Sequence, residues 1–194
     1  MLDTHLPTSR PADTTTFTIK VEGEALPGTY RIVSVDIDRA INRIATANLV
    51  LYDGDPAAQD FPLSSGALLI PGQEIEIEGG YSGDESLLFK GVITRQKIKA
   101  RRKGESLLLI ECKDACYRMT LTRKSRYFKD SADSDVFESI GGEYSGVSIE
   151  AEATGAPLPD IVQFQASDWD FIVSRAEALG MVCTTDDGTS YHSN

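Results

Sequence analysis

The chain has 194 residues, of which 41% are hydrophobic and 25% charged, and its formal net charge at pH 7 is −11. Such a composition is that of an ordinary soluble protein, and a chain of this length buries roughly 70% of its unfolded surface without disulfides or metals. No run of about 18 apolar residues occurs, so we expect neither a membrane-spanning segment nor membrane binding.

The N-terminus and the cysteines indicate the compartment. The first residues have neither the basic region nor the apolar core of a Sec signal. Cys112, Cys116 and Cys183 are odd in number and lack the spacing of a disulfide framework, which is typical of a reducing compartment. We therefore expect a protein that is assembled in the cytoplasm.

The first two thirds of the chain have the pattern of a β-protein. Residues 1–16 are rich in Thr, Ser, Pro and Asp and predict a flexible N-terminal tail. From Phe17 onward, alternating apolar and polar side chains predict six strands with turns between them. These strands cover residues 17–21, 30–38, 41–52, 74–78, 87–100 and 107–112. Short strands with almost no helix predict a β-barrel over residues 17–122.

The remaining sequence predicts an α+β domain over residues 123–194, so the whole chain is expected to be mainly β. Residues 114–130 are interpreted as a link that crosses the barrel, and residues 134–140 as a short helix. Further strands are predicted at 147–151, 161–164 and 181–184. The hairpin signal at residues 186–188 leaves little sequence for a return strand, which indicates an incomplete domain and a fragment of a longer protein.

The clearest helix is predicted over residues 167–179. Ser167 is a good N-cap, and Gly180 stands where a helix ends in a left-handed residue. One apolar stripe of this helix follows the helical period; it consists of Trp169, Ile172, Val173, Ala176 and Leu179. Phe171 and Ala178 lie on the opposite side, and we hypothesise that they form a second face that binds a partner. The alternative is that Phe171 packs beneath a loop of its own chain.

The charge is unevenly distributed along the chain. Residues 95–126 contain eleven Lys or Arg against three acids, a net charge of +8, so the rest of the chain carries −19. Within this segment, Arg95, Lys97 and Lys99 share one face of a predicted strand. Arg101, Arg102 and Lys103 follow in the hairpin loop. The segment predicts a directional surface for an acidic protein or for nucleic acid; the alternative is a solvated strand face.

The sequence contains no convincing catalytic or metal-binding pattern. Cys112 and Cys116 lack the two-residue spacer that is usual in structural zinc sites. No Gly-x-Ser-x-Gly motif or phosphate-binding glycine loop occurs. Basic strands that bind single-stranded nucleic acid carry stacking aromatics, and residues 95–103 contain none. We therefore predict a protein that is not an enzyme, with no catalytic, cofactor-binding or metal-binding residues, and the net negative charge argues against nucleic acid.

Several motifs in the right order resemble one family. The first is Leu88-Phe-Lys-Gly-Val-Ile-Thr-Arg, followed by Ile110-Glu-Cys-Lys-Asp-Ala; the next is Thr122-Arg-Lys-Ser-Arg-Tyr-Phe, followed by Asp133-Ser-Asp-Val-Phe-Glu-Ser-Ile. The most specific motif is the helix that opens at Ser167. Together these motifs resemble the VgrG spike proteins of type VI secretion and their phage baseplate hub relatives. The segment Leu26-Pro-Gly-Thr-Tyr-Arg-Ile-Val-Ser-Val is closest to the spike proteins of extracellular contractile injection systems.

The resemblance implies a structural hub in an injected or secreted particle. Family members are homotrimers whose phage-tail-type barrels form a ring that matches a hexameric, Hcp-like tube. A C-terminal spike carries a tip or cargo, and the second barrel, the linking domain and the spike have no counterpart in this sequence. Alternatives are a barrel that binds nucleic acid through the hairpin 95–103 and a fragment of a particle-associated hydrolase.

Overall fold

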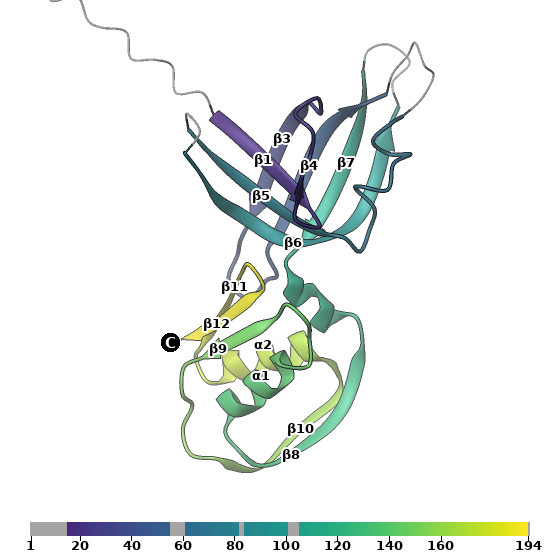
Figure 1. Ribbon diagram of the computed structural model, residues 1–194. Helices are drawn as coiled ribbons and strands as arrows, with labels where there is room; N and C mark the ends of the chain where they lie inside the picture. The colour runs from purple at the N-terminus through teal and green to yellow at the C-terminus, as the bar shows by residue number, and fades with distance from the viewer. Residues whose placement is uncertain (1–14, 55–60, 82–83, 101–104, 194) are drawn as a thin grey trace, which may run out of the picture.

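The computed structural model describes residues 15–54, 61–81, 84–100 and 105–193. Figure 1 shows a large curved sheet above a smaller unit of two helices and short strands. Thr15 and Thr16, which we predicted to belong to the flexible tail, begin the first strand, and the rest of that tail lies outside the described residues.

The large sheet is antiparallel and has seven strands in the order β2-β1-β5-β6-β7-β4-β3. Its strands are β1 (Thr15–Val21), β2 (Glu24–Ala25), β3 (Ile32–Asp38), β4 (Thr46–Asp53), β5 (Glu74–Tyr81), β6 (Asp84–Lys99) and β7 (Ser106–Lys113). Alternation along these strands places one face inside: Ala47, Leu49 and Leu51 of β4 are fully buried. Burial of each large aliphatic side chain on this face stabilises the sheet by roughly 1.5–3 kcal/mol.

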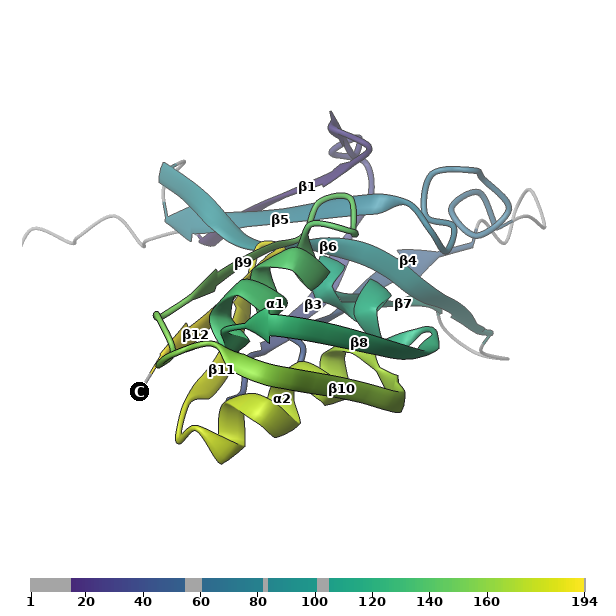
Figure 2. The ribbon, with the colours of Figure 1, turned by 90° about the horizontal axis from the view of Figure 1, so that it is seen from below.

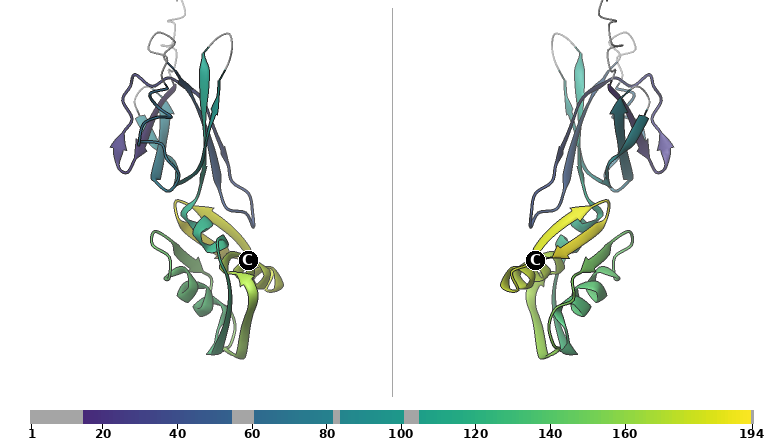
Figure 3. Two further views of the ribbon diagram at one scale, coloured as in Figure 1. Left: turned by 90° about the vertical axis from the view of Figure 1, so that its right-hand side faces the viewer. Right: turned by 90° about the vertical axis from the view of Figure 1, so that its left-hand side faces the viewer.

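The expectation of a closed barrel is corrected by the sheet topology. In Figure 3 the two halves of the sheet face each other around the first hydrophobic core. However, no described backbone pairing joins β1 to β3, so hydrogen bonds do not close the sheet. The segment from Leu26 to Tyr30 lies along this opening and packs Leu26 and Tyr30 against the core. Side chains rather than a strand ladder therefore border the opening, where a cavity of about 210 Å³ remains.

The smaller unit combines a 3-10 helix, two α-helices and five strands. In chain order these are η1 (Ala115–Thr120), β8 (Arg123–Ser131), α1 (Asp133–Gly141), β9 (Ser148–Ala151), β10 (Leu158–Ser167), α2 (Asp168–Ala178), β11 (Val182–Asp186) and β12 (Thr189–Ser193). Strands β8 and β10 form a two-stranded ribbon, and β11, β12 and β9 form a three-stranded sheet. The helices lie between the ribbon and this small sheet (Figures 1 and 2). A second core, which includes Phe137, Ile172 and Met119, fills the space between them.

The caps of α2 agree with the sequence. The hydroxyl of Ser167 accepts a hydrogen bond of 3.1 Å from the N–H of Asp170. At the other end Gly180 has φ +75°, and the N–H groups of Gly180 and Met181 donate to the carbonyls of Glu177 and Ala176. These two hydrogen bonds form a Schellman motif, which ends the helix. Leu179, predicted to join the buried stripe, is 43% exposed because it stands after the last helical turn.

Strand β8 occupies residues that we predicted to be a link. The prediction failed because the inward positions of β8 include Lys124 and Arg126, whose charges hide the alternation of a strand. Ribbon partner β10 is also longer than the predicted 161–164. The hairpin at Asp187 and Gly188 is as expected: both residues have positive φ, which fits a type I′ turn, and β12 is its return strand.

Candidate interaction surfaces

The predicted basic strand face is present on β6. A bulge between Ile93 and Arg95 shifts the register, so that Arg95, Lys97 and Lys99 point to the outer face. Arg95 is paired at 2.5 Å with Glu111 of β7. Among the described residues, no ion pair involves Lys97 or Lys99, and both side chains are exposed. Arg101, Arg102 and Lys103 lie outside the described residues.

Apolar side chains accompany these two lysines on the outer face. The pairing places Lys99 opposite Leu107 of β7, and Leu107 opposite Tyr52 of β4. One row further along, Lys97 stands opposite Leu109. Directly opposed residues on one sheet face contact each other, so the lysines flank a partly apolar strip.

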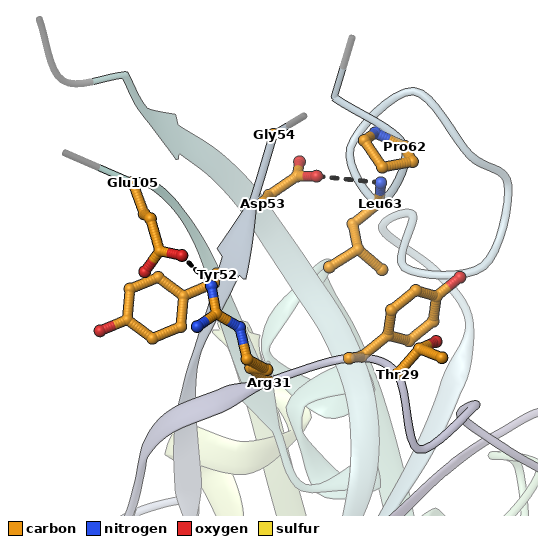
Figure 4. Close-up of a pocket in the computed structure, with 9 residues that line it drawn as sticks. Thr29, Arg31, Tyr52, Asp53, Gly54, Pro62, Leu63 and Glu105 are labelled. Atoms are coloured by element: carbon orange, nitrogen blue, oxygen red, sulfur yellow. Dashed lines mark hydrogen bonds and ion pairs between the residues drawn. The ribbon is translucent and has the colours of Figure 1, made fainter. Parts of the chain in front are cut away.

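A cavity of about 300 Å³ opens where this strip reaches the end of the sheet (Figure 4). Its lining includes Arg31, Tyr52, Leu63 and Glu105. Arg31 lies over the Tyr52 ring, with its guanidinium carbon 4.5 Å from the ring centroid, and forms an ion pair with Glu105. On the opposite side, Asp53 is buried and accepts hydrogen bonds of 3.0 Å from the N–H groups of Leu63 and Ser64. Sequence patterns did not indicate this cavity, because its walls come from four separate segments.

The predicted second face of α2 is corrected in part. Phe171 is only 7% exposed, because its ring stacks on that of Phe128 in β8, with centroids 6.2 Å apart and ring planes 16° apart. Phe171 therefore belongs to the second core and is not available to a partner. Ala178 is exposed, as expected, but it does not form an exposed apolar face together with Phe171, because Phe171 is buried.

Two cations of the basic segment point inward instead of toward a partner. Asp168, at the start of α2, is fully buried and accepts hydrogen bonds from Lys124 (2.9 Å), Arg126 (2.5 and 2.6 Å), Tyr144 (2.5 Å) and Gln163 (2.8 Å). Burial alone would raise the pKa of Asp168, but these donors hold it below its usual value. Burial likewise opposes the charge of Lys124, yet hydrogen bonds to Asp168, Tyr144 and Glu143 raise its pKa. This buried network reduces the basic surface that the sequence predicts.

The two units are joined by polar contacts around the β11–β12 hairpin. Asn42 exchanges two hydrogen bonds with the backbone of Cys183, of 2.7 and 2.8 Å. The hydroxyl of Thr185 accepts from the N–H of Ala45 at 2.8 Å, and Arg39 pairs with Asp186 at 2.9 Å. These contacts fix the hairpin against the loop between β3 and β4.

The three cysteines, Cys112, Cys116 and Cys183, are buried, and none of them is joined in a disulfide. Burial raises the pKa of Cys112 and of Cys183 to about 12, and raises that of Cys116 as well. Within the described ranges, no three His, Cys, Asp or Glu residues are grouped so that they could hold a metal ion. None of the helices described here is long and apolar enough to span a membrane.

The fold defined by this curved sheet and α+β unit is that of phage tail and type VI secretion proteins. The chain belongs to the family described as Alg8 N-terminal domain, which matches residues 11–191. Comparison with curated proteins gave no match.

Three solved structures illustrate the likeness. A tail protein from Neisseria meningitidis MC58 has a TM-score of 0.67 and 15% identity, with 92% of this chain and 50% of that chain covered. The E. coli c3393 protein is a type VI secretion component similar to the T4 tail proteins gp27 and gp5. It has a TM-score of 0.66 and 13% identity, with 89% of this chain and 48% of that chain covered. A chain of the Francisella PdpA–VgrG complex has a TM-score of 0.62 and 14% identity, with 92% of this chain and 28% of that chain covered. The resemblance to VgrG and phage hub proteins is thus confirmed as a shared fold, and this chain spans half or less of these three relatives.

Proposed function

We propose that this chain is a structural, non-enzymatic part of the hub of a contractile injection machine. In this role it would trimerise and adapt a hexameric tube to a spike, in a particle that assembles in the cytoplasm and is then injected or secreted. The observation that carries the proposal is a fold that matches tail and type VI secretion proteins over about nine tenths of the chain. Spike tip and cargo would be held by parts of the longer protein.

The two units would have different tasks. We propose that the sheet unit contacts the tube and that the α+β unit, beginning near Asp114, connects it to the spike. The separate hydrophobic cores support this division, since residues from Ile19 to Cys112 form the first core and residues from Cys116 to Cys183 form the second. Lys97 and Lys99 are the cations that we assign to an acidic surface of the tube, because complementary charge steers such encounters.

The test is the light-scattering mass of the chain, alone and mixed with the tube protein of the same gene cluster. We expect a trimer, or three chains per tube ring. Reversal of Lys97 and Lys99 to Glu should weaken the complex, and reversal of Arg101, Arg102 and Lys103 should weaken it further. The matched control reverses Arg123 and Lys129, which are exposed on the ribbon. A chain that stays monomeric and ignores the tube would contradict the proposal.

A further inference from the structure

We propose that the cavity beside Arg31 is a binding site for an acidic segment of a partner protein. One aromatic or large aliphatic side chain of that segment would enter the cavity, and a neighbouring carboxylate would replace Glu105 on Arg31. The inference deepens the proposed function, because it identifies where an assembly partner is held on the sheet unit.

The dimensions of the cavity suit a single side chain. Its volume of about 300 Å³ is at the lower end of the range for small-molecule sites. Tyr30, Tyr52, Pro62 and Leu63 contribute apolar or aromatic surface to the lining. In Figure 4, Leu63 and Thr29 lie across the opening from Tyr52 and Arg31. An aromatic side chain between these walls would bury surface on both faces of its ring.

Arg31 is the one cation among the described lining residues, and two carboxylates, Asp53 and Glu105, lie beside it. Both oxygens of Asp53 accept hydrogen bonds from backbone N–H groups, so a ligand carboxylate would pair with Arg31 in place of Glu105. The side chains of Arg31 and Glu105 are 60% and 50% exposed, and an ion pair this exposed contributes little to stability. Glu105 can therefore be displaced at little cost, while the Tyr52 ring continues to hold the guanidinium.

The outer face of the sheet extends the site. Lys99, Leu107 and Tyr52 stand in one row across three adjacent strands, and neighbouring strands are about 4.8 Å apart. A segment lying along this row would place apolar side chains on Leu107 and Tyr52 and carboxylates near Lys99 and Arg31. This arrangement predicts a ligand in which acidic residues flank an apolar one.

The probe is the peptide acetyl-Glu-Glu-Phe-Glu-Glu-amide, titrated into the ¹⁵N-labelled chain and followed by NMR. We expect shifts at the amides of Arg31, Tyr52 and Leu63, with weaker binding when the peptide carries Ala in place of Phe and none when Lys replaces Glu. Arg31→Gln should weaken binding about fivefold, the upper end of what one exposed ion pair contributes. Glu105→Gln should strengthen binding, because it frees Arg31. Lys20→Gln, which breaks an ion pair on β1, is the control.

Two results would overturn the inference. One is the same affinity for the Phe and Ala peptides with shifts confined to Lys97 and Lys99, which would show simple charge attraction. The other is no shift at about 10 mM peptide, a concentration at which binding with a Kd of even about 6 mM is detectable. Tube binding of the same variants separates the two proposals: if Arg31→Gln leaves it intact while reversal of Lys97 and Lys99 abolishes it, the hub role stands and the cavity is not the contact.

Discussion

The backbone N–H of Gly188 donates a hydrogen bond of 2.9 Å to Oδ2 of Asp114, 74 residues earlier in the chain. The other carboxylate oxygen of Asp114 accepts from the N–H of Cys116 at 2.8 Å. One buried aspartate therefore holds both the start of η1 and the tip of the β11–β12 hairpin. Because Asp114 directly follows β7, it lies where the chain leaves the large sheet and enters the smaller unit.

Replacement of Gly188 by Ala should destabilise the protein. Gly188 has φ +83°, and a Cβ there would lie 2.3 Å from the carbonyl oxygen of Gly146. We expect a loss of about 2–3 kcal/mol, the sum of a left-handed residue with a side chain and a displaced hairpin. Gly23→Ala is the matched control: its φ is +81° with nothing within 4 Å, so about 1 kcal/mol is expected. Urea unfolding measures both, and equal losses would show that the Gly146 contact is unimportant.

Asp168→Asn should be among the most destabilising polar changes. It removes the buried carboxylate that Lys124 and Arg126 share, while both keep Glu143 as an ion-pair partner. The loss should therefore lie near the lower end of the cost of breaking a buried ion pair, which is about 3–5 kcal/mol. Asp160→Asn, at an exposed position of the same ribbon, should cost far less. Thermal unfolding of the two variants at pH 7 compares them. A loss no larger than that of Asp160→Asn would show that solvent replaces the network.

The free energy of unfolding should depend on pH through the ionisation of Asp168. Its folded pKa lies below the ordinary value of 3.8, so its stabilisation is present above pH 3.8 and is lost as the pH falls through the folded pKa. Lys124 has the opposite sign: its folded pKa lies above 10.5, so its contribution is complete below pH 10.5 and is lost at higher pH. The difference in unfolding free energy between wild type and Asp168→Asn should thus be flat from pH 5 to 9 and shrink in acid. A difference that grows in acid would contradict the assignment.

The stacked position of Phe171 predicts a clear contrast within α2. Phe171→Ala should cost about 3–5 kcal/mol, as for other buried aromatic truncations. Ala178→Ser, on the exposed surface of the same helix, should change stability by about 0.5 kcal/mol or less. Chemical denaturation provides both numbers. A small loss for Phe171→Ala would revive the hypothesis that Phe171 serves a partner instead of the core.

The three thiols should be unreactive in the folded protein. Each is buried, and burial holds the pKa of each well above that of a free cysteine. A colorimetric thiol reagent at pH 8 should therefore label all three only after unfolding in denaturant. Fast labelling of one cysteine in the native protein would show local opening around it.

Local signals in the sequence predicted most helices and strands, whereas the structure was needed to show which of them pack against one another. Ser167 and Gly180 define the ends of α2 because caps act within a few residues. Strand β8 was missed because two of its inward positions carry charged side chains, Lys124 and Arg126. These side chains point inward because they donate hydrogen bonds to Asp168, some 40 residues away in the sequence. The position of Phe171 depends on Phe128 in the same way, and helical periodicity alone cannot reveal a neighbour on another strand.

The candidate site shows the same division. The alternation of Arg95, Lys97 and Lys99 was visible in the sequence, but their pairing with Leu107, Leu109 and Glu111 depends on the register of β6 against β7. The cavity depends on still more distant relations, since Arg31, Tyr52, Leu63 and Glu105 come from separate segments. Closure of the barrel was predicted wrongly because the number of strands does not say whether the two edges of the sheet pair with each other.

The parallel pairing of β12 with β9 has a consequence for the order in which the protein forms on the ribosome. Residues of β9 leave the ribosome well before Thr189 and Ser190, which pair with Ser148 and Ile149. Until those later residues emerge, β9 has no strand partner in the described chain, whereas every strand of the large sheet is complete by Lys113. Vectorial synthesis at about 5–20 residues per second therefore gives the large sheet several seconds to fold before the smaller unit can close.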